Sequence, residues 1–295
     1  MRKKHSQYER LKKRWVKRHQ ELQDRLISTH GEAAHWIGSN AKQLAVGGAA
    51  GLMLLHAATP STTLPPRSVS AQELPQEPAP TPDKSAFFMT DLHQYVPHTV
   101  EPLSKQQKQA IGGVLSQYFG LDVQPSLNGI ELNSAYGYIG EEQHLARYPG
   151  DTMGSHFDNQ NDARLYWSSG MAPGLGAWGY FAPSQAQMTG EDKMREKYYI
   201  AVQTFLAPGY LDHVGEYNDF FRYRKMLVVN PDNGKALVAV IGDAGPASWT
   251  GKQLGGSPEV MSYLERVDGA QKGPVLYFFV NDPENKVPLG PINVQ

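Results

Sequence analysis

Two acidic residues have the types and the local sequence that acid catalysis on a sugar needs. Asp243 follows the apolar run 236–241 and precedes a Gly-Pro turn, so we expect its carboxylate at the mouth of a β-structure. Glu191 falls in a Thr-Gly-Glu turn and is expected to face it. Two carboxylates in one cleft can have separated pKa values, which leaves one protonated to donate to a glycosidic oxygen. The alternative is that Asp243 only accepts backbone N–H groups of its own turn.

A second group of potential ligands lies in the Gly-rich segment 141–158. Imidazole and carboxylate together suit zinc, and a metal-dependent peptidase would need His144, Asp151 and His156 to converge. The seven-residue offset from His144 to Asp151 occurs in some zinc-dependent D,D-peptidases, but larger and charged residues replace the small residues of that signature. We therefore expect His144 and Arg147 to tie down a long loop by hydrogen bonds and ion pairs, with no stoichiometric zinc.

Aromatic side chains offer a way to hold a polysaccharide without cleaving it. A ring presents an apolar face on which a sugar can stack, and Trp and Tyr add a polar edge. The candidate glycan-binding residues are Trp167, Trp178, Tyr180 and Trp249.

No cofactor is expected. Residues 174–179 have the glycine spacing of a dinucleotide-binding loop, but neither the strand before it nor the helix after it. Residues 245–252 resemble a P-loop with one residue too many between the glycines, and Gln253 stands where Ser or Thr would bind magnesium. Without cysteine there is no disulfide, zinc finger or iron–sulfur cluster.

The N-terminal third predicts a membrane topology. Residues 1–42 carry eleven Lys and Arg against four Asp and Glu and form a basic arm, and 43–58 are an almost continuous apolar run. The positive flank predicts a single-pass anchor of a bacterial cell membrane, with the arm in the cytoplasm and the folded domain outside. A cleaved signal ending at Val69-Ser70-Ala71 is the alternative, and it would make the protein secreted. Residues 59–85 form a Pro-rich linker. No nucleic-acid partner is expected, because basic charge is confined to the arm.

The rest of the chain predicts a mainly β domain with a small α/β extension. Ser104 begins a capping-box helix that ends at Gly120, and the following dozen residues indicate two short strands. Residues 134–173 are expected to be a long loop. In the C-terminal part the sequence predicts a hairpin of 226–230 with 236–243, a short helix from Ser257, and a strand over 275–280.

Several motifs between Ala177 and Leu264 resemble the double-psi β-barrel of the rare lipoprotein A and expansin group. They are an opening strand AWGYF at 177–181, a TGE turn at 189–191, a VVNPDNGK hairpin at 228–235 and a DAGP strand end at 243–246. The resemblance implies a double-psi β-barrel over 174–295, with the α/β extension and long loop over 86–173. It also implies action on peptidoglycan, in which a muramyl hydroxyl is the internal nucleophile of a lytic transglycosylase.

The chain departs from that group at one catalytic position. Val202 stands eleven residues after Glu191, where the resembled enzymes have His. We therefore predict a membrane-tethered envelope protein that binds or remodels wall glycan, as a weak transglycosylase using Asp243 and Glu191. The alternatives are a non-catalytic, expansin-like wall-binding module and the metal-dependent wall peptidase described above.

Overall fold

The computed structural model describes residues 84–266 and 273–295. The basic arm, the apolar run 43–58 and the linker up to residue 83 lie outside the described residues. Among the residues that are described, no helix is both long and apolar enough to cross a bilayer.

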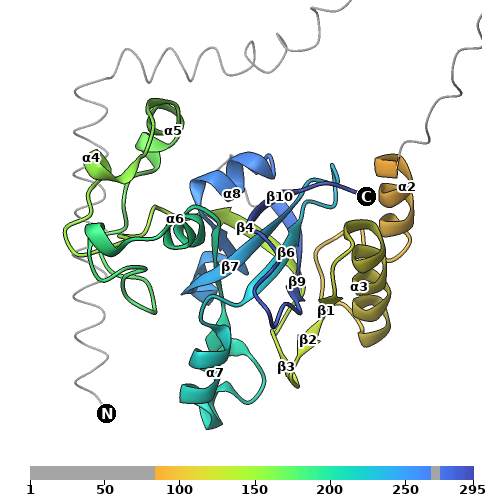
Figure 1. The fold of residues 1–295 in the computed structure, drawn as a ribbon. Helices are drawn as coiled ribbons and strands as arrows, with labels where there is room; N and C mark the ends of the chain where they lie inside the picture. The colour runs from red at the N-terminus through yellow and green to blue at the C-terminus, as the bar shows by residue number, and fades with distance from the viewer. Residues whose placement is uncertain (1–83, 267–272) are drawn as a thin grey trace, which may run out of the picture. The chain divides into compact units, whose positions relative to one another are not determined.

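Six strands close into a barrel, in the order β9-β4-β8-β5-β7-β6 and back to β9 (Figure 1). Strands β4 with β8 and β5 with β7 pair in parallel, and the other pairs of the ring are antiparallel. The barrel strands are β4 (Tyr136–Glu141), β5 (Tyr199–Val202), β6 (Lys225–Val229), β7 (Ala236–Ala244), β8 (Leu254–Gly256) and β9 (Gly273–Val280). A mainly β barrel is therefore confirmed.

Short strands and helices surround this ring. Strand β1 (Val123–Gln124) extends the sheet beside β9, β10 (Gly290–Ile292) extends it beside β7, and β2 (Ser126–Leu127) pairs with β3 (Ile130–Glu131). The helices are α2 (Lys84–His93), α3 (Lys105–Phe119), α4 (Met153–His156), α5 (Gln160–Tyr166), α6 (Gly190–Lys197), α7 (Val214–Phe221) and α8 (Pro258–Tyr263). Single 3-10 turns occur at Trp167–Ser169, Gln185–Gln187, Thr204–Leu206, Tyr210–Asp212 and Ser248–Thr250.

Both faces of the barrel wall are buried, which explains the continuous apolar runs of its strands. Met226 and Val228 of β6 point into one core cluster, whereas the alternating Leu227 and Val229 belong to a second. The second cluster includes residues of α2 and α3, and Figure 1 shows these helices on one side of the barrel, opposite the segment that carries α4, α5 and α6. Because successive side chains of a strand point to opposite faces, β6 contributes residues to both core clusters.

The locally encoded elements are confirmed. Helix α3 has Ser104 as N-cap with a complete capping box, and Gly120 at φ +64° ends it. β6 and β7 form the expected antiparallel hairpin, and Gly234 at φ +74° donates to the Asn230 carbonyl to close its turn. Helix α8 has Ser257 as N-cap and proline in its first turn.

Two expectations for the barrel are wrong. Residues 134–173 are not all loop, because Tyr136–Glu141 form the barrel strand β4. The glycines of β4 interrupt the residue alternation by which a strand is predicted. They are required by close contacts: a Cβ at Gly137 would lie 2.7 Å from Gln253 Cβ, and a Cβ at Gly140 would lie 2.6 Å from Lys252 Cδ. Residues 177–181, expected as the opening strand, are not a strand: residues 176–179 form a tight turn closed by an isolated bridge between Gly176 and Gly179.

Candidate functional site

Asp243 lies at the end of β7 and is held by backbone groups. Its Oδ1 accepts N–H bonds from Ala177 at 2.6 Å and from Ala244 at 2.8 Å. Its Oδ2 has no hydrogen bond to any described residue and is not one of the fully buried polar atoms without a partner. Burial raises the pKa of Asp243 above its usual value, and the two N–H bonds oppose this only in part. The result is a carboxyl group with a fixed orientation, one available oxygen and an increased tendency to hold a proton.

Glu191 does not form a pair with Asp243. The Thr-Gly-Glu segment is not an inter-strand turn: Thr189 is the N-cap of α6, and Glu191 lies in that helix's first turn. Its Oε1 accepts hydrogen bonds from Arg195 at 2.7 Å and from Asn285 at 3.0 Å, and its side chain is half exposed. The carboxylate proposed as the second acid is therefore engaged elsewhere.

The position of the absent histidine is structural. Val202 is 1% exposed and belongs to the larger core cluster, where β5 pairs with β7 and with β8. Ala201 is paired with Asp243 across that ladder. Because Ala201 and Val202 are both apolar, β5 supplies no proton-transfer group beside Asp243.

The aromatic candidates divide into two groups. Trp178 follows Ala177, which donates to Asp243, and Trp249 lies in the 3-10 turn shortly after Asp243, with 88% of its surface exposed. Tyr180 is half-buried in the turn after Trp178. Trp167 lies instead in the segment that carries α5, with its ring 6.4 Å from that of Phe157. Trp178 thus follows a residue that is bonded to Asp243, and Trp249 lies six positions after Asp243 in the chain.

A buried polar network joins the segment 144–156 to Glu196 of α6. Glu196 on α6 accepts from His144 Nδ1 at 3.4 Å, from His156 Nε2 at 3.0 Å and from the Leu145 backbone N–H at 3.1 Å. The other nitrogen of His156, Nδ1, lies 3.1 Å from Asp151 Oδ2. Asp151 also accepts from the Arg147 backbone N–H and from its Nε, both at 3.0 Å. His144 and Arg147 do tie the long segment together, by the kind of contacts expected.

Leu145 links the network to Asp243. A Cβ placed on Gly176 would lie 3.1 Å from Leu145 Cδ1 and 3.5 Å from Asp243 Cγ, so the three residues pack together. Tyr199 is buried and its hydroxyl donates to the Gln143 carbonyl. Its pKa is raised well above the usual value, mainly by burial and further by the charges of Glu196 and Asp243, among others. The network therefore supports the segment that holds Asp243.

The charges of the network are balanced. Burial opposes ionisation, but hydrogen bonds to the two carboxylates raise the pKa of His156 to about 9. Although burial opposes it, hydrogen bonds from His144 and His156 lower the pKa of Glu196 to about 2. Against the same effect of burial, hydrogen bonds from His156 and Arg147 lower the pKa of Asp151 well below its usual range. Two carboxylates thus face two cations, Arg147 and the imidazolium of His156.

The donor set that fits a metal differs from the expected one. Nitrogen and oxygen atoms of His144, His156 and Glu196 all lie within 4.8 Å of one another, which suits a small transition metal in donor type and spacing. Asp151 is bonded to Arg147 and His156 and would act behind His156, as a carboxylate that orients a histidine. Zinc would have to displace a proton from a network already balanced in charge. We retain the prediction of no stoichiometric zinc.

Sequence reasoning missed Glu196 and Glu259. Glu196 was hidden in the charged run GEDKMREK of α6, in which only Asp192 and Glu196 are buried. Glu259, on α8, is 6% exposed, and burial is the main reason that its pKa is raised to about 7. Its Oε2 is buried without a hydrogen-bond partner among the described residues.

Glu259→Gln is expected to flatten the pH dependence of stability between pH 4.5 and 6.5. The folded-state pKa of Glu259, about 7, exceeds its usual value of 4.5, so the folded protein binds this proton more tightly and loses stability as the pH rises through that window. The full loss by pH 7 is on the order of 3 kcal/mol, at about 1.4 kcal/mol per pKa unit. Glu196 titrates below this window and His156 above it. Urea unfolding at several pH values measures the slope.

The control is Glu216→Gln, which removes an exposed carboxylate whose ion-pair partner is His213 on the same helix end. It should keep the wild-type slope. An unchanged slope in Glu259→Gln would contradict the assignment.

The resemblance to the rare lipoprotein A and expansin group stays a prediction. No family model, no curated protein and no solved structure matches this chain.

Proposed function

We propose that the described domain binds wall glycan, peptidoglycan or a related polysaccharide, at the barrel end that carries Asp243, and that Asp243 is the acid of a weak glycan-cleaving activity. The observation that supports this most is the state of Asp243: Oδ1 is fixed by two backbone N–H groups, Oδ2 is available, and burial raises the pKa. A general acid needs this combination of fixed position and retained proton.

The chemistry requires two proton transfers. Protonated Asp243 would donate to the glycosidic oxygen as the bond to the anomeric carbon breaks. A base must then take the proton of the muramyl hydroxyl as that oxygen attacks the anomeric carbon. Because Glu191 is bonded to Arg195 and Val202 is apolar, Asp243 would have to serve as acid and then, as carboxylate, as base. One group acting in both steps is consistent with slow turnover.

A non-catalytic, expansin-like wall-binding module is the second candidate. The same two observations favour it, since neither the expected second acid nor the expected histidine stands beside Asp243. In that case the aromatic residues, the exposed Trp249 above all, carry the function and Asp243 only orders its turn. The proposed β topology is that of a double-psi barrel, and the proposed partner is the same in both candidates.

The site of action proposed is outside the cell membrane. The basic arm before the apolar run 43–58 supports an anchor with the arm in the cytoplasm, and the Pro-rich linker would separate the domain from the bilayer. Distance from the membrane suits a protein that contacts a wall layer.

Trp249→Ala is expected to weaken binding of the full-length chain to insoluble wall material by about threefold to tenfold, because it removes a stacking face for a sugar ring. Trp249 is 88% exposed, so the change should leave folding intact. A pull-down with purified, washed wall sacculi measures the bound fraction. Phe87→Ala is the matched control: its ring is 57% exposed on α2, a helix whose buried residues belong to the second core cluster. Equal binding by both variants and wild type would contradict a glycan site at this end.

A further inference from the structure

We propose that His144, His156 and Glu196 form a binding site for one divalent transition-metal ion, which an ion supplied in solution can enter. The three side chains come from two parts of the chain, the segment 144–156 and helix α6. Their donor atoms lie within 4.8 Å of one another, and all three residues are buried. Two imidazoles with one carboxylate form a donor set that suits zinc, cobalt and nickel. The site uses none of the atoms of the glycan site, so it is independent of the proposed function.

The two histidines are oriented as metal ligands are. His156 Nδ1 lies 3.1 Å from Asp151 Oδ2, and His156 Nε2 lies 3.0 Å from Glu196 Oε2. A carboxylate behind one ring nitrogen fixes the tautomer in which the other nitrogen faces a metal. His144 directs Nδ1 at the other oxygen of Glu196, at 3.4 Å, and the two imidazole ring centres are 4.5 Å apart. Both imidazoles thus direct a nitrogen toward the same carboxylate.

Two buried polar atoms in this region have no hydrogen-bond partner among the described residues. They are His144 Nε2 and Glu259 Oε2, and their residues are 0% and 6% exposed. Glu259, on α8, is close enough to the cluster for the charges of His144 and Glu196 to act on its pKa, which burial raises to about 7. A buried polar atom without a partner costs stability, and in native structures it commonly indicates a bound water or ion. These atoms indicate that the cluster holds a further polar species.

The charge of the region favours a divalent ion over a proton once Glu259 is ionised. Three buried carboxylates then face two buried cations: Asp151, Glu196 and Glu259 against Arg147 and the imidazolium of His156. A divalent ion in place of the His156 proton restores neutrality. The proton leaves Nε2 for the solvent, and a metal–nitrogen bond forms in place of the N–H bond. A chain purified without added metal is expected to keep the proton, in agreement with the prediction of no stoichiometric zinc.

A partly exposed ring covers the two histidines. The Phe157 ring packs edge-on against both imidazoles, with its centre 5.3 Å from each of theirs. It also lies 6.4 Å from the ring of Trp167, which is exposed. We expect movement of the Phe157 side chain to admit an ion to the histidines without unfolding of the barrel.

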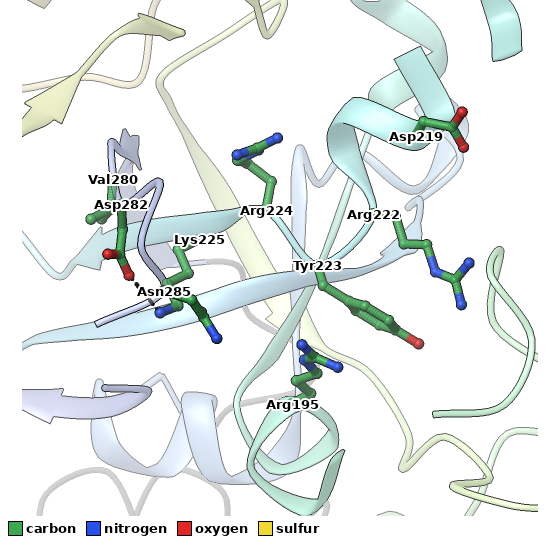
Figure 2. Close-up of a pocket in the computed structure, with 9 residues that line it drawn as sticks. All are labelled: Arg195, Asp219, Arg222, Tyr223, Arg224, Lys225, Val280, Asp282 and Asn285. Atoms are coloured by element: carbon green, nitrogen blue, oxygen red, sulfur yellow. Dashed lines mark hydrogen bonds and ion pairs between the residues drawn. The ribbon is translucent and has the colours of Figure 1, made fainter. Parts of the chain in front are cut away.

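The charged pocket shown in Figure 2 offers no comparable set of donors. The side chains of Arg222 and Arg224 point away from each other, and Lys225 Nζ pairs with Asp282 Oδ2 at 2.6 Å. Within the described ranges, metal-binding side chains converge only at His144, His156 and Glu196.

The test is a titration of the purified full-length chain with cobalt(II) chloride at about pH 8, where Glu259 is ionised. We expect saturable binding with the strong visible absorption of four- or five-coordinate cobalt, and release of a proton as the ion binds. His144→Gln removes a ligand and should weaken this binding at least about tenfold. The control is His213→Gln, which removes an exposed imidazole next to α7 and should bind cobalt as the wild type does.

A second variant, Phe157→Ala, leaves all the ligands in place, so it remains informative if His144→Gln fails to fold. It should speed the removal of bound cobalt by EDTA severalfold, because the ring that covers the histidines is gone. Three results would overturn the proposal: no such absorption with the wild-type chain, equal cobalt binding by His144→Gln and wild type, or equal rates of removal from Phe157→Ala and wild type. None of these measurements involves wall glycan, so their failure is distinct from failure of the proposed function.

Discussion

Replacing Glu196 with alanine is expected to lower the free energy of unfolding by about 3–5 kcal/mol at pH 6, the effect of removing one partner from a buried ion pair. Glu196 is 2% exposed and accepts hydrogen bonds from His144, His156 and the Leu145 N–H. Without it, the imidazolium of His156 keeps only Asp151, and two further buried donors lose their acceptor. Urea unfolding followed by tryptophan fluorescence measures the change.

The matched control is Glu191→Ala on the same helix. Five positions separate Glu191 from Glu196, which places them on nearly opposite faces of α6. Glu191 is half exposed and its ion pair is with Arg195, so its loss should change stability by less than about 1 kcal/mol. A loss of under 1 kcal/mol for Glu196→Ala would show that the network does not stabilise the fold.

The pH dependence gives an independent check of the same network. The pKa of Glu196 is lowered to about 2, so its stabilisation is complete above pH 4.5 and is lost as the pH falls through 2. The pKa of His156 is raised to about 9, so its stabilisation is complete below pH 6.5 and is lost as the pH rises through 9. Glu196→Ala should therefore reduce the loss of stability in both the acidic and the alkaline range.

Replacing Asp243 with asparagine is expected to reduce release of soluble anhydro-muropeptides by about 10²–10⁴-fold, the usual contribution of a general acid. Asparagine keeps an oxygen in the position that accepts the Ala177 and Ala244 N–H groups, so the turn should survive while the transferable proton is lost. Chromatography of digested sacculi measures the release, and a sacculus pull-down shows that binding persists.

The control for this prediction is Glu191→Gln. It should leave any release unchanged, because Glu191 is bonded to Arg195 and Asn285. If the wild-type chain binds sacculi and releases nothing, the non-catalytic module is the correct reading. Rapid release that persists in Asp243→Asn would exclude both readings.

The elements that the sequence predicted correctly are those encoded by neighbouring residues. The capping box at Ser104, the Asn-Gly turn between β6 and β7, and the Ser-Pro start of α8 each depend on hydrogen bonds and backbone angles within a few residues. Strand β9 was likewise predicted correctly, because almost all of its residues are apolar and an apolar run indicates a buried strand. A mainly β domain follows from these local signals.

The predictions from sequence were wrong where the local structure depends on contacts with residues far away along the chain. Strand β4 contains Gly137 and Gly140 because Gln253 and Lys252 lie against it from beside β8, more than a hundred residues away. Its sequence therefore lacks the alternation of a strand. The segment 177–181 has aromatic residues at alternating positions, as a strand would. Gly176 and Gly179 nevertheless close a turn there, and the contact that uses this turn, from the Ala177 N–H to Asp243, is formed only in the folded chain.

The amino-acid sequence by itself determined the barrel's hairpin and its capped helices, and it identified His144, His156 and Asp243 as residues of chemically capable types. The tertiary structure alone decided their partners. Glu196 joins His144 and His156 from 52 and 40 positions away, while Glu191, the more conspicuous carboxylate, faces outward on the same helix. The physical reason is that a pattern of apolar residues depends only on neighbours along the chain. A buried carboxylate, in contrast, is stabilised only by the cations and N–H groups that folding brings around it.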